Sequence, residues 1–343
     1  CWNSIANGAD GIVFFRWRSL PYGAEAHWNG LLYHDERNTW RLDEAKRLGQ
    51  EIDRLSATLT GTRCASPAAI LYDFDNNSHA KIEHATGKHR EASERAVYQA
   101  LAERHLSADI CALSSVQRSG DLSAYQIVFF PHAHVLAAAD TELLQDYVEA
   151  GGTLVFGCWS GYRDRNHWCY DATGKAFYED FVGARVSDFT VVTPGETSSM
   201  RFDNSDAPIE APTFNEVLAP VTADVSVLAS YTSDYYAGQP AVTLHKKGKG
   251  RVIHFGSFFT SQNVTSLLDA LAIQDPVQAW VKVPAEVQVT LRSNDTEHFC
   301  FLLNFSNESK AVTFNQPTSD LLEERELNGQ AEVPPYGVRL IRL

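Results

Sequence analysis

The feature that most constrains the fold is an alternation of short apolar runs with amphipathic runs between residues 66 and 156. Residues 90–105 and 141–150 place apolar side chains three or four positions apart, which is the spacing of one buried helix face. We expect a polar loop at residues 75–89. Strands that alternate with helices at these distances predict a doubly wound parallel sheet. The predicted strands are residues 68–73, 108–113, 126–131 and 153–156.

The first 60 residues have a different pattern. An apolar run at residues 12–15 predicts a buried strand, and the loop after it carries Arg, Trp, Tyr, Glu and His side chains. Loops of this kind at the carboxyl ends of strands form the ligand sites of α/β proteins. Residues 42–59 predict a helix. A parallel strand needs neighbours on both sides, and the chain starts with Cys1 rather than Met. We therefore expect a fragment whose remaining sheet precedes Cys1.

After residue 185 the helical pattern fades. Short runs rich in Val, Thr and aromatic residues predict strands at 226–231, 241–246 and 251–255, and residues 260–273 predict a last helix. From residue 283 onward the chain shows only strand and turn patterns. This tail predicts a small antiparallel β-sandwich.

Composition excludes several classes of protein. The formal net charge of −14 argues against a nucleic-acid partner, which requires a concentrated basic face. We find no run of about 18 apolar residues that would cross a membrane. The six cysteines are scattered and include no Cys-x-x-Cys pair, so neither a zinc site nor a disulfide framework is expected. These features predict a soluble cytoplasmic protein.

Several motifs in order along the chain resemble glycoside hydrolase family 42, the β-galactosidases. They begin with Gly8-Ala-Asp-Gly-Ile-Val-Phe-Phe-Arg-Trp-Arg and Gly23-Ala-Glu25. Asp121-Leu-Ser-Ala-Tyr and Tyr147-Val-Glu-Ala-Gly-Gly-Thr-Leu-Val follow, then Gly248-Lys-Gly-Arg-Val, Phe301-Leu-Leu-Asn-Phe and Pro335-Tyr-Gly-Val. Each motif is weak alone, and the ordered set is more specific.

The resemblance implies three domains. Residues 1–60 would be the last βα unit of a catalytic (β/α)8 barrel, residues 65–275 a trimerisation domain similar to class I glutamine amidotransferase domains, and residues 283–343 a β-sandwich. The family hydrolyses β-galactosides with retention, using two Glu residues about 5 Å apart. The resemblance places both upstream of Cys1, so this chain should carry no catalytic residue. It also implies a homotrimer, a β-galactoside or related sugar as substrate, and no cofactor.

The resemblance assigns a substrate-binding role to the loop after the predicted first strand. Family members have a Glu here that holds sugar hydroxyls, and it corresponds to Glu25. A His usually follows three or four residues later, but Trp28 and Asn29 occupy those positions here. Asn29 can donate and accept hydrogen bonds, and Trp28 can stack on the apolar face of a sugar. We expect Arg16 and Arg18 to form ion pairs rather than to contact sugar.

Alternative functions stay open at this point. The chain could be a non-catalytic module for assembly or carbohydrate binding. It could also be an amidotransferase-like hydrolase, because Cys158 follows a predicted strand as a nucleophile does in a strand–turn–helix elbow; a structural turn is the simpler interpretation. His132 and His134 lack a third metal ligand and are expected to be surface or interface histidines. The aromatic loop around Trp159, Tyr162, Trp168 and Tyr170 fits either an intrachain cluster or a contact with a neighbouring subunit.

Overall fold

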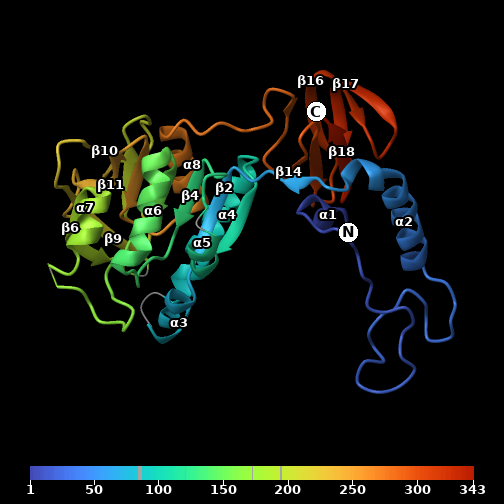
Figure 1. Cartoon of the computed structure of the whole chain (residues 1–343), viewed down its shortest axis with the longest axis horizontal. Helices are drawn as coiled ribbons and strands as arrows, with labels where there is room; N and C mark the ends of the chain where they lie inside the picture. Colours follow the sequence, from blue (N-terminus) through green and yellow to red (C-terminus); the bar gives the residue numbers. More distant parts are fainter. Residues whose placement is uncertain (84–86, 120, 172, 194) are drawn as a thin grey trace. The chain divides into compact units, whose positions relative to one another are not determined.

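The computed structural model describes residues 1–83, 87–119, 121–171, 173–193 and 195–343 (Figure 1). The chain divides into two units, one formed by residues 66–276 and the other by residues 1–65 together with 277–343. Residues 1–60 and 283–343, predicted as separate domains, thus share a unit. The three-domain division with its boundaries stays a prediction.

A nine-stranded sheet forms the centre of residues 66–276. Its order is β3-β2-β4-β5-β12-β11-β10-β7-β8, and the first five strands run parallel. The other four extend the sheet antiparallel, an extension that the sequence did not predict. The parallel strands are β3 (Ala108–Ala112), β2 (Ala68–Tyr72), β4 (Ile127–Phe130), β5 (Thr153–Phe156) and β12 (Gly250–Phe255). The antiparallel strands are β11 (Pro240–Lys247), β10 (Val225–Tyr231), β7 (Ser199–Phe202) and β8 (Ile209–Glu210).

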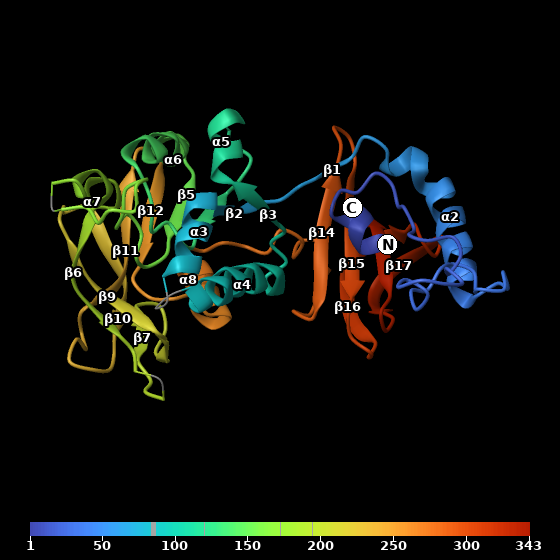
Figure 2. The ribbon, with the colours of Figure 1, turned by 90° about the horizontal axis from the view of Figure 1, so that it is seen from below.

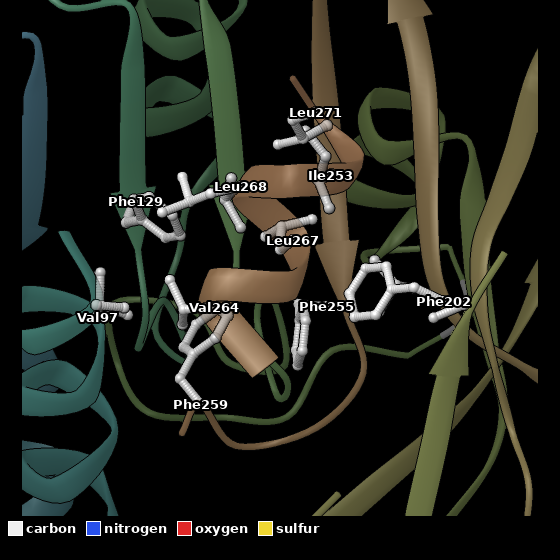
Figure 3. Close-up of a cluster of buried hydrophobic side chains, with 14 of the residues drawn as sticks. Val97, Phe129, Phe202, Ile253, Phe255, Phe259, Val264, Leu267, Leu268 and Leu271 are labelled. Atoms are coloured by element: carbon white, nitrogen blue, oxygen red, sulfur yellow. The ribbon is translucent and has the colours of Figure 1, made fainter. Parts of the chain in front are cut away.

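Helices cover both faces of this sheet because alternate residues of its buried strands are apolar on opposite sides. Phe129 and Ile253 pack with helices α4 and α8 on one face (Figure 3). Val128 and Leu154 pack with α5, α6 and α7 on the other. The helices are α4 (Gly87–Glu103), α5 (Leu113–Ser119), α6 (Ala138–Ala150), α7 (Ala176–Val182) and α8 (Ser261–Ala270). The sequence prediction of an α/β unit with a parallel-rich sheet is therefore confirmed.

The predicted polar loop at residues 75–89 is wrong over most of its length. Residues Phe74–Ile82 form helix α3, and α4 already begins at Gly87, while residues 84–86 lie outside the described residues. Asp73 caps α3, since its carboxylate accepts a hydrogen bond from the backbone N–H of Asn76 at 3.2 Å. The helix was missed because it is rich in Asp, Asn and Ser, which favour turns in isolation.

A separate two-stranded antiparallel sheet lies beside the large one. It consists of β6 (Ala184–Val191) and β9 (Phe214–Pro220), in which Val191 pairs with Phe214. A bridge between Asn215 and Ser257 ties the start of β9 to the segment that follows β12. This bridge places the end of β6 at the same edge as the carboxyl ends of the parallel strands.

The other unit is built on one antiparallel sheet, of order β1-β14-β15-β18-β16-β13 with β17 paired to β16 (Figure 2). The tail is antiparallel as predicted, but hydrogen bonds join its strands into one sheet rather than the two of a sandwich. One face packs on α1 (Trp2–Ala6) through Ile5 and on α2 (Trp40–Leu59) through Leu55. The strands are β1 (Arg63–Cys64), β13 (Val281–Lys282), β14 (Val287–Ser293), β15 (His298–Asn304), β16 (Lys310–Asp320), β17 (Arg325–Val333) and β18 (Val338–Arg342).

The predicted buried strand at residues 12–15 is not formed. These residues have no strand partner among the described residues, and Val13 and Phe15 are 95% and 74% exposed. A strand exists only when a neighbouring strand pairs its backbone N–H and C=O groups. The predicted helix at 42–59 is confirmed, and it begins at Trp40 because the Thr39 hydroxyl accepts from the backbone N–H of Arg41 at 3.1 Å.

The packing of α8 on the sheet generates a prediction about stability. Leu267 is fully buried between α8 and the strands (Figure 3). We expect Leu267→Ala to lower the free energy of unfolding of this unit by about 2–5 kcal/mol, because it removes buried methyl groups and leaves a cavity. Denaturant titration followed by circular dichroism measures the loss. Ile110→Ala, at an exposed position, should change it by less than about 0.5 kcal/mol, and equal losses in both variants would contradict the packing.

Candidate functional site

The loop after residues 12–15 is organised around Arg16. Its guanidinium forms an ion pair with the Glu25 carboxylate, through Nη2 and Oε2. The Arg16 side chain is only 11% exposed, whereas the Glu25 side chain is 43% exposed. Arg16 Nε and Nη1 are buried without a hydrogen-bond partner among the described residues. Glu25 therefore lies at the surface and is paired with the largely buried guanidinium of Arg16, two of whose nitrogens make no hydrogen bond to the described residues.

Trp28 lies next to this ion pair. Its ring centre is 6.4 Å from that of Phe15, and the Arg16 guanidinium lies 5.8 Å from the Trp28 ring. The Trp28 backbone N–H donates to the carbonyl oxygen of Glu25 at 3.0 Å. Trp28 and Asn29 are both exposed. The structure thus brings Glu25 and Trp28 together, and sugar binding by Glu25, Trp28 and Asn29 stays a prediction.

Close backbone packing closes the loop at Gly30. A Cβ atom there would lie 2.6 Å from the backbone of Arg18 and Ser19, so only glycine fits. The Gly30 N–H donates to the Ser19 hydroxyl at 2.8 Å. Arg18 forms an ion pair with Glu36, so both arginines form ion pairs as predicted. His34, which the sequence did not single out, contributes a ring nitrogen 2.7 Å from the Ala26 carbonyl oxygen.

An apolar groove of about 730 Å³ lies beside the same segment, within the unit of residues 1–65 and 277–343. One wall is residues 9–14, and the other is the face of α2 that carries Leu48 and Ile52. Arg63 and Arg292 line one part of it. Val13 and Phe15, which flank the lining residues Ile12 and Phe14, are exposed.

The sequence also singled out Cys158 as a candidate nucleophile, at the carboxyl end of β5. Cys158 is 4% exposed, and burial, together with the nearby charge of Glu216, raises the pKa of its thiol. A nucleophilic cysteine needs the opposite shift. The left-handed residue of the turn is Trp159, with a φ of 63°, rather than Cys158. The turn therefore lacks the geometry and the electrostatics of a nucleophile elbow.

His254, on the adjacent strand β12, has a hydrogen-bond partner at each of its two ring nitrogens. His254 Nε2 lies 2.7 Å from Glu216 Oε2, and its Nδ1 lies 2.9 Å from the Tyr178 hydroxyl. Glu216 Oε1 accepts from the Trp159 backbone N–H at 3.1 Å. With both ring nitrogens occupied, His254 has no site left to take a proton from Cys158. This buried network fixes the turn, as the structural interpretation of Cys158 predicts.

Four histidines gather at the carboxyl ends of β2 and β4. His79 comes from α3, His132 and His134 follow β4, and His167 belongs to the loop after β5. His79 Nδ1 lies 3.1 Å from His167 Nδ1, and Arg163 Nε donates to His134 Nε2 at 3.1 Å. The expectation that His132 and His134 are surface or interface histidines is wrong, because both are only 4% exposed within the single chain. His79 was not singled out from the sequence, whereas His167 is, with His132 and His134, a candidate base for Cys158 in the sequence; the fold brings all four to this place.

Burial dominates the electrostatics of these histidines. It lowers the pKa of His132 to about 3, and the charge of Arg90 contributes further. It lowers the pKa of His134 to about 2, and burial with the charge of Arg163 also lowers the pKa of His79. Across the described parts of the chain, no group of three or more His, Cys, Asp or Glu side chains is placed to hold a metal ion. Likewise, none of the described helices is long and apolar enough to span a membrane.

The buried histidines predict acid sensitivity. His132 binds a proton in the unfolded chain below about pH 6.5 but in the folded chain only near pH 3. Its contribution to stability is complete above pH 6.5 and is lost as the pH falls toward 3, by about 1 kcal/mol per pH unit. His132→Leu should flatten this slope in denaturant titrations between pH 6.5 and 5. The exposed His27→Gln should leave it unchanged, and an identical slope in wild type and His132→Leu would contradict the assignment.

Comparison with known proteins follows the same division of the chain. The model of the β-galactosidase trimerisation domain matches residues 66–278. The model of the β-galactosidase C-terminal domain matches residues 286–343, and the β-galactosidase model itself matches residues 1–55. The chain is 26% identical over 342 residues to the β-galactosidase BgaA of Clostridium cellulovorans, covering 99% of this chain and 50% of BgaA.

Other relatives give the same result. The β-galactosidase LacZ of Heyndrickxia coagulans is 27% identical, with 100% of this chain and 50% of that protein covered. The chain thus spans about half the length of these relatives. The crystal structure of a β-galactosidase from Bacillus circulans sp. alkalophilus shares the fold with a TM-score of 0.88 at 21% identity, covering 99% of this chain and 51% of that one. The match to the trimerisation domain spans more than half of the residues, and the chain belongs to glycoside hydrolase family 42, the β-galactosidase family.

Proposed function

We propose that the chain works as the C-terminal portion of a retaining β-galactosidase that hydrolyses terminal β-galactosides. The observation that carries the proposal is the ordered match of three β-galactosidase models across residues 1–55, 66–278 and 286–343. In this proposal the acid/base Glu and the nucleophilic Glu belong to earlier strands of the catalytic domain. Residues 1–343 then contribute part of the sugar site and the means of assembly.

Residues 1–60 are proposed as the last βα unit of a (β/α)8 barrel, with α2 as its helix. The exposure of Val13 and Phe15 supports this, because residues 12–15 would gain backbone and side-chain partners as the eighth strand of a barrel. The groove between residues 9–14 and α2 would be filled by an adjoining barrel element. Exposed apolar side chains and an open apolar groove are unfavourable in contact with water, whereas both would be buried inside a barrel.

Glu25 is the proposed sugar-holding residue. A carboxylate accepts hydrogen bonds from two adjacent sugar hydroxyls, and the Arg16 ion pair fixes where that carboxylate lies. The exposed indole of Trp28 offers an apolar face for the sugar ring, and Asn29 offers a donor and an acceptor. Because the Arg16 side chain is largely buried, its guanidinium stays beside Glu25 rather than extending into solvent.

The proposed partner is a second and a third copy of the same chain, in a homotrimer. The trimerisation-domain match over residues 66–278 supports self-association. A cytoplasmic location is proposed as well. No disulfide links the six cysteines, all of which lie in the described part of the chain, and this suits a reducing compartment.

The division of labour can be tested directly. Purified residues 1–343 should release no nitrophenol from nitrophenyl β-galactoside, since both catalytic carboxylates are assigned elsewhere. The same residues joined to the preceding strands of the catalytic domain should hydrolyse it. Release of nitrophenol by residues 1–343 alone would refute the assignment, and an inactive complete protein would refute the proposed activity.

Glu25 generates a second prediction. In the protein with a complete catalytic domain, Glu25→Gln should lower kcat/KM for nitrophenyl β-galactoside about 10- to 100-fold, the value of one or two hydrogen bonds to a charged acceptor. Glu36→Gln is the matched control, because Glu36 is the carboxylate paired with the other arginine of the loop. Its kcat/KM should stay within about twofold of wild type. Equal effects of the two substitutions on kcat/KM would contradict the assignment of Glu25 to the sugar-binding site.

A further inference from the structure

A short turn in the loop between α1 and α2 carries Glu25 (Figure 1). Two overlapping backbone hydrogen bonds shape it. The Ala26 N–H donates to the Gly23 carbonyl oxygen at 3.1 Å, and the Trp28 N–H donates to the Glu25 carbonyl oxygen at 3.0 Å. Gly23 begins the turn with a φ of 85°, a conformation that favours glycine. We call residues 23–28 the Glu25 turn.

The Glu25 turn needs contacts from outside itself. Fixing the backbone of six residues costs more conformational entropy than two hydrogen bonds offset. Arg16 supplies one outside contact, the ion pair with the Glu25 carboxylate. His34 supplies another, because its Nε2 lies 2.7 Å from the carbonyl oxygen of Ala26. One contact therefore holds the carboxylate, and the other holds the backbone at the next residue.

The acceptor decides how His34 acts on the turn. A carbonyl oxygen can only accept a hydrogen bond, so His34 Nε2 carries the proton in this contact. This nitrogen is protonated both in one neutral tautomer of the ring and in the charged ring. The contact is thus compatible with either charge state, and His34 acts on the turn as a hydrogen-bond donor.

His34 follows a segment that is fixed on two sides. The Leu31 N–H donates to the Arg16 carbonyl oxygen at 2.9 Å. The Leu31 carbonyl oxygen accepts from the Thr39 hydroxyl at 2.7 Å, and Thr39 is the N-cap of α2. The next residue, Leu32, is 8% exposed. The donor is therefore anchored to the segment that carries Arg16 and to the start of α2, and it can hold the turn in one place relative to both.

We propose that His34 is a positioning residue for Glu25, which it holds through the backbone of Ala26. The inference rests on the proposed sugar-holding role of Glu25 and adds a residue that fixes its backbone. A group that binds sugar hydroxyls has to stay within about 0.5 Å of its productive place. Arg16 restrains the Glu25 carboxylate, and His34 restrains the main chain from which that carboxylate projects. Loss of the His34 ring then weakens sugar binding without removing a group that touches the sugar.

The first test uses the protein with a complete catalytic domain and nitrophenyl β-galactoside. His34→Ala should raise KM about three- to tenfold, the value of one hydrogen bond, and leave kcat within about twofold of wild type. His34→Gln should restore KM to within about twofold, because the glutamine amide can donate in place of Nε2. Asp35→Ala is the matched control and should change KM by less than about twofold. Asp35 is the next residue of the chain, but its carboxylate accepts from Arg37 Nε at 2.7 Å.

A double substitution separates positioning from general support of the fold. In a protein that carries Glu25→Ala, no carboxylate is left to position. His34→Ala should therefore cause no further loss of kcat/KM beyond about twofold in that protein. Losses that multiply in the double variant would overturn the inference, and so would equal effects of His34→Ala and Asp35→Ala on KM.

A second measurement does not depend on activity and uses residues 1–343. Amide hydrogen exchange of residues 23–28, followed by mass spectrometry, should be about three- to tenfold faster in His34→Ala and return to the wild-type rate in His34→Gln. The Trp28 N–H closes the turn, so its exchange reports whether the turn is held. Exchange at the wild-type rate in His34→Ala would overturn the inference. A complete wild-type protein that releases no nitrophenol would refute the proposed activity, while the exchange rate still decides whether His34 holds the turn.

Discussion

The structure of residues 66–276 depends on the burial of a parallel sheet on both faces. Strands β2, β4, β5 and β12 carry apolar side chains on both sides, and neither side can face water without cost. Helices must therefore cover both faces, and each connection between parallel strands has to cross over one of them. Backbone geometry then leaves the two edges of the sheet, where strands end and loops begin, as the places for polar side chains.

The carboxyl edge collects these polar groups. The switch in strand order lies between β2 and β4, since β3 lies on one side of β2 and β4 on the other. Such a point opens a crevice at the strand ends in many α/β proteins. Here His79, His132 and His134 fill it, and the loop of Arg163 and Arg165 covers it. A position that elsewhere holds a ligand is here packed with buried histidine side chains.

Sequence periodicity predicted the elements whose stability comes from burial. The four first parallel strands, α2, α6 and α8 were all placed within a few residues, because their apolar spacing reflects a buried face. It failed where stability depends on a distant partner. Residues 12–15 have the sequence pattern of a strand but pair with no strand among the described residues. Helix α3 is stabilised by the Asp73 cap and by the hydrogen bond that the Asn76 side chain donates to the Val135 carbonyl oxygen. His132 is buried near His134, His79 and Arg90, which come from different segments of the chain, and no local pattern can reveal this.

Prediction from sequence has the same limit for the candidate functional residues. Resemblance selected Glu25, but only the fold shows that Arg16 lies buried beneath it with two unused donors. Resemblance in layout also selected Cys158, and there the fold decides against catalysis. An acid–base pair needs one histidine nitrogen free to exchange a proton, yet Glu216 and Tyr178 hold both nitrogens of His254. Desolvation keeps the neighbouring thiol protonated. A strand end that activates a nucleophile in some α/β proteins is thus a structural turn in this one. The polar groups around Cys158 are buried and already hydrogen-bonded to one another.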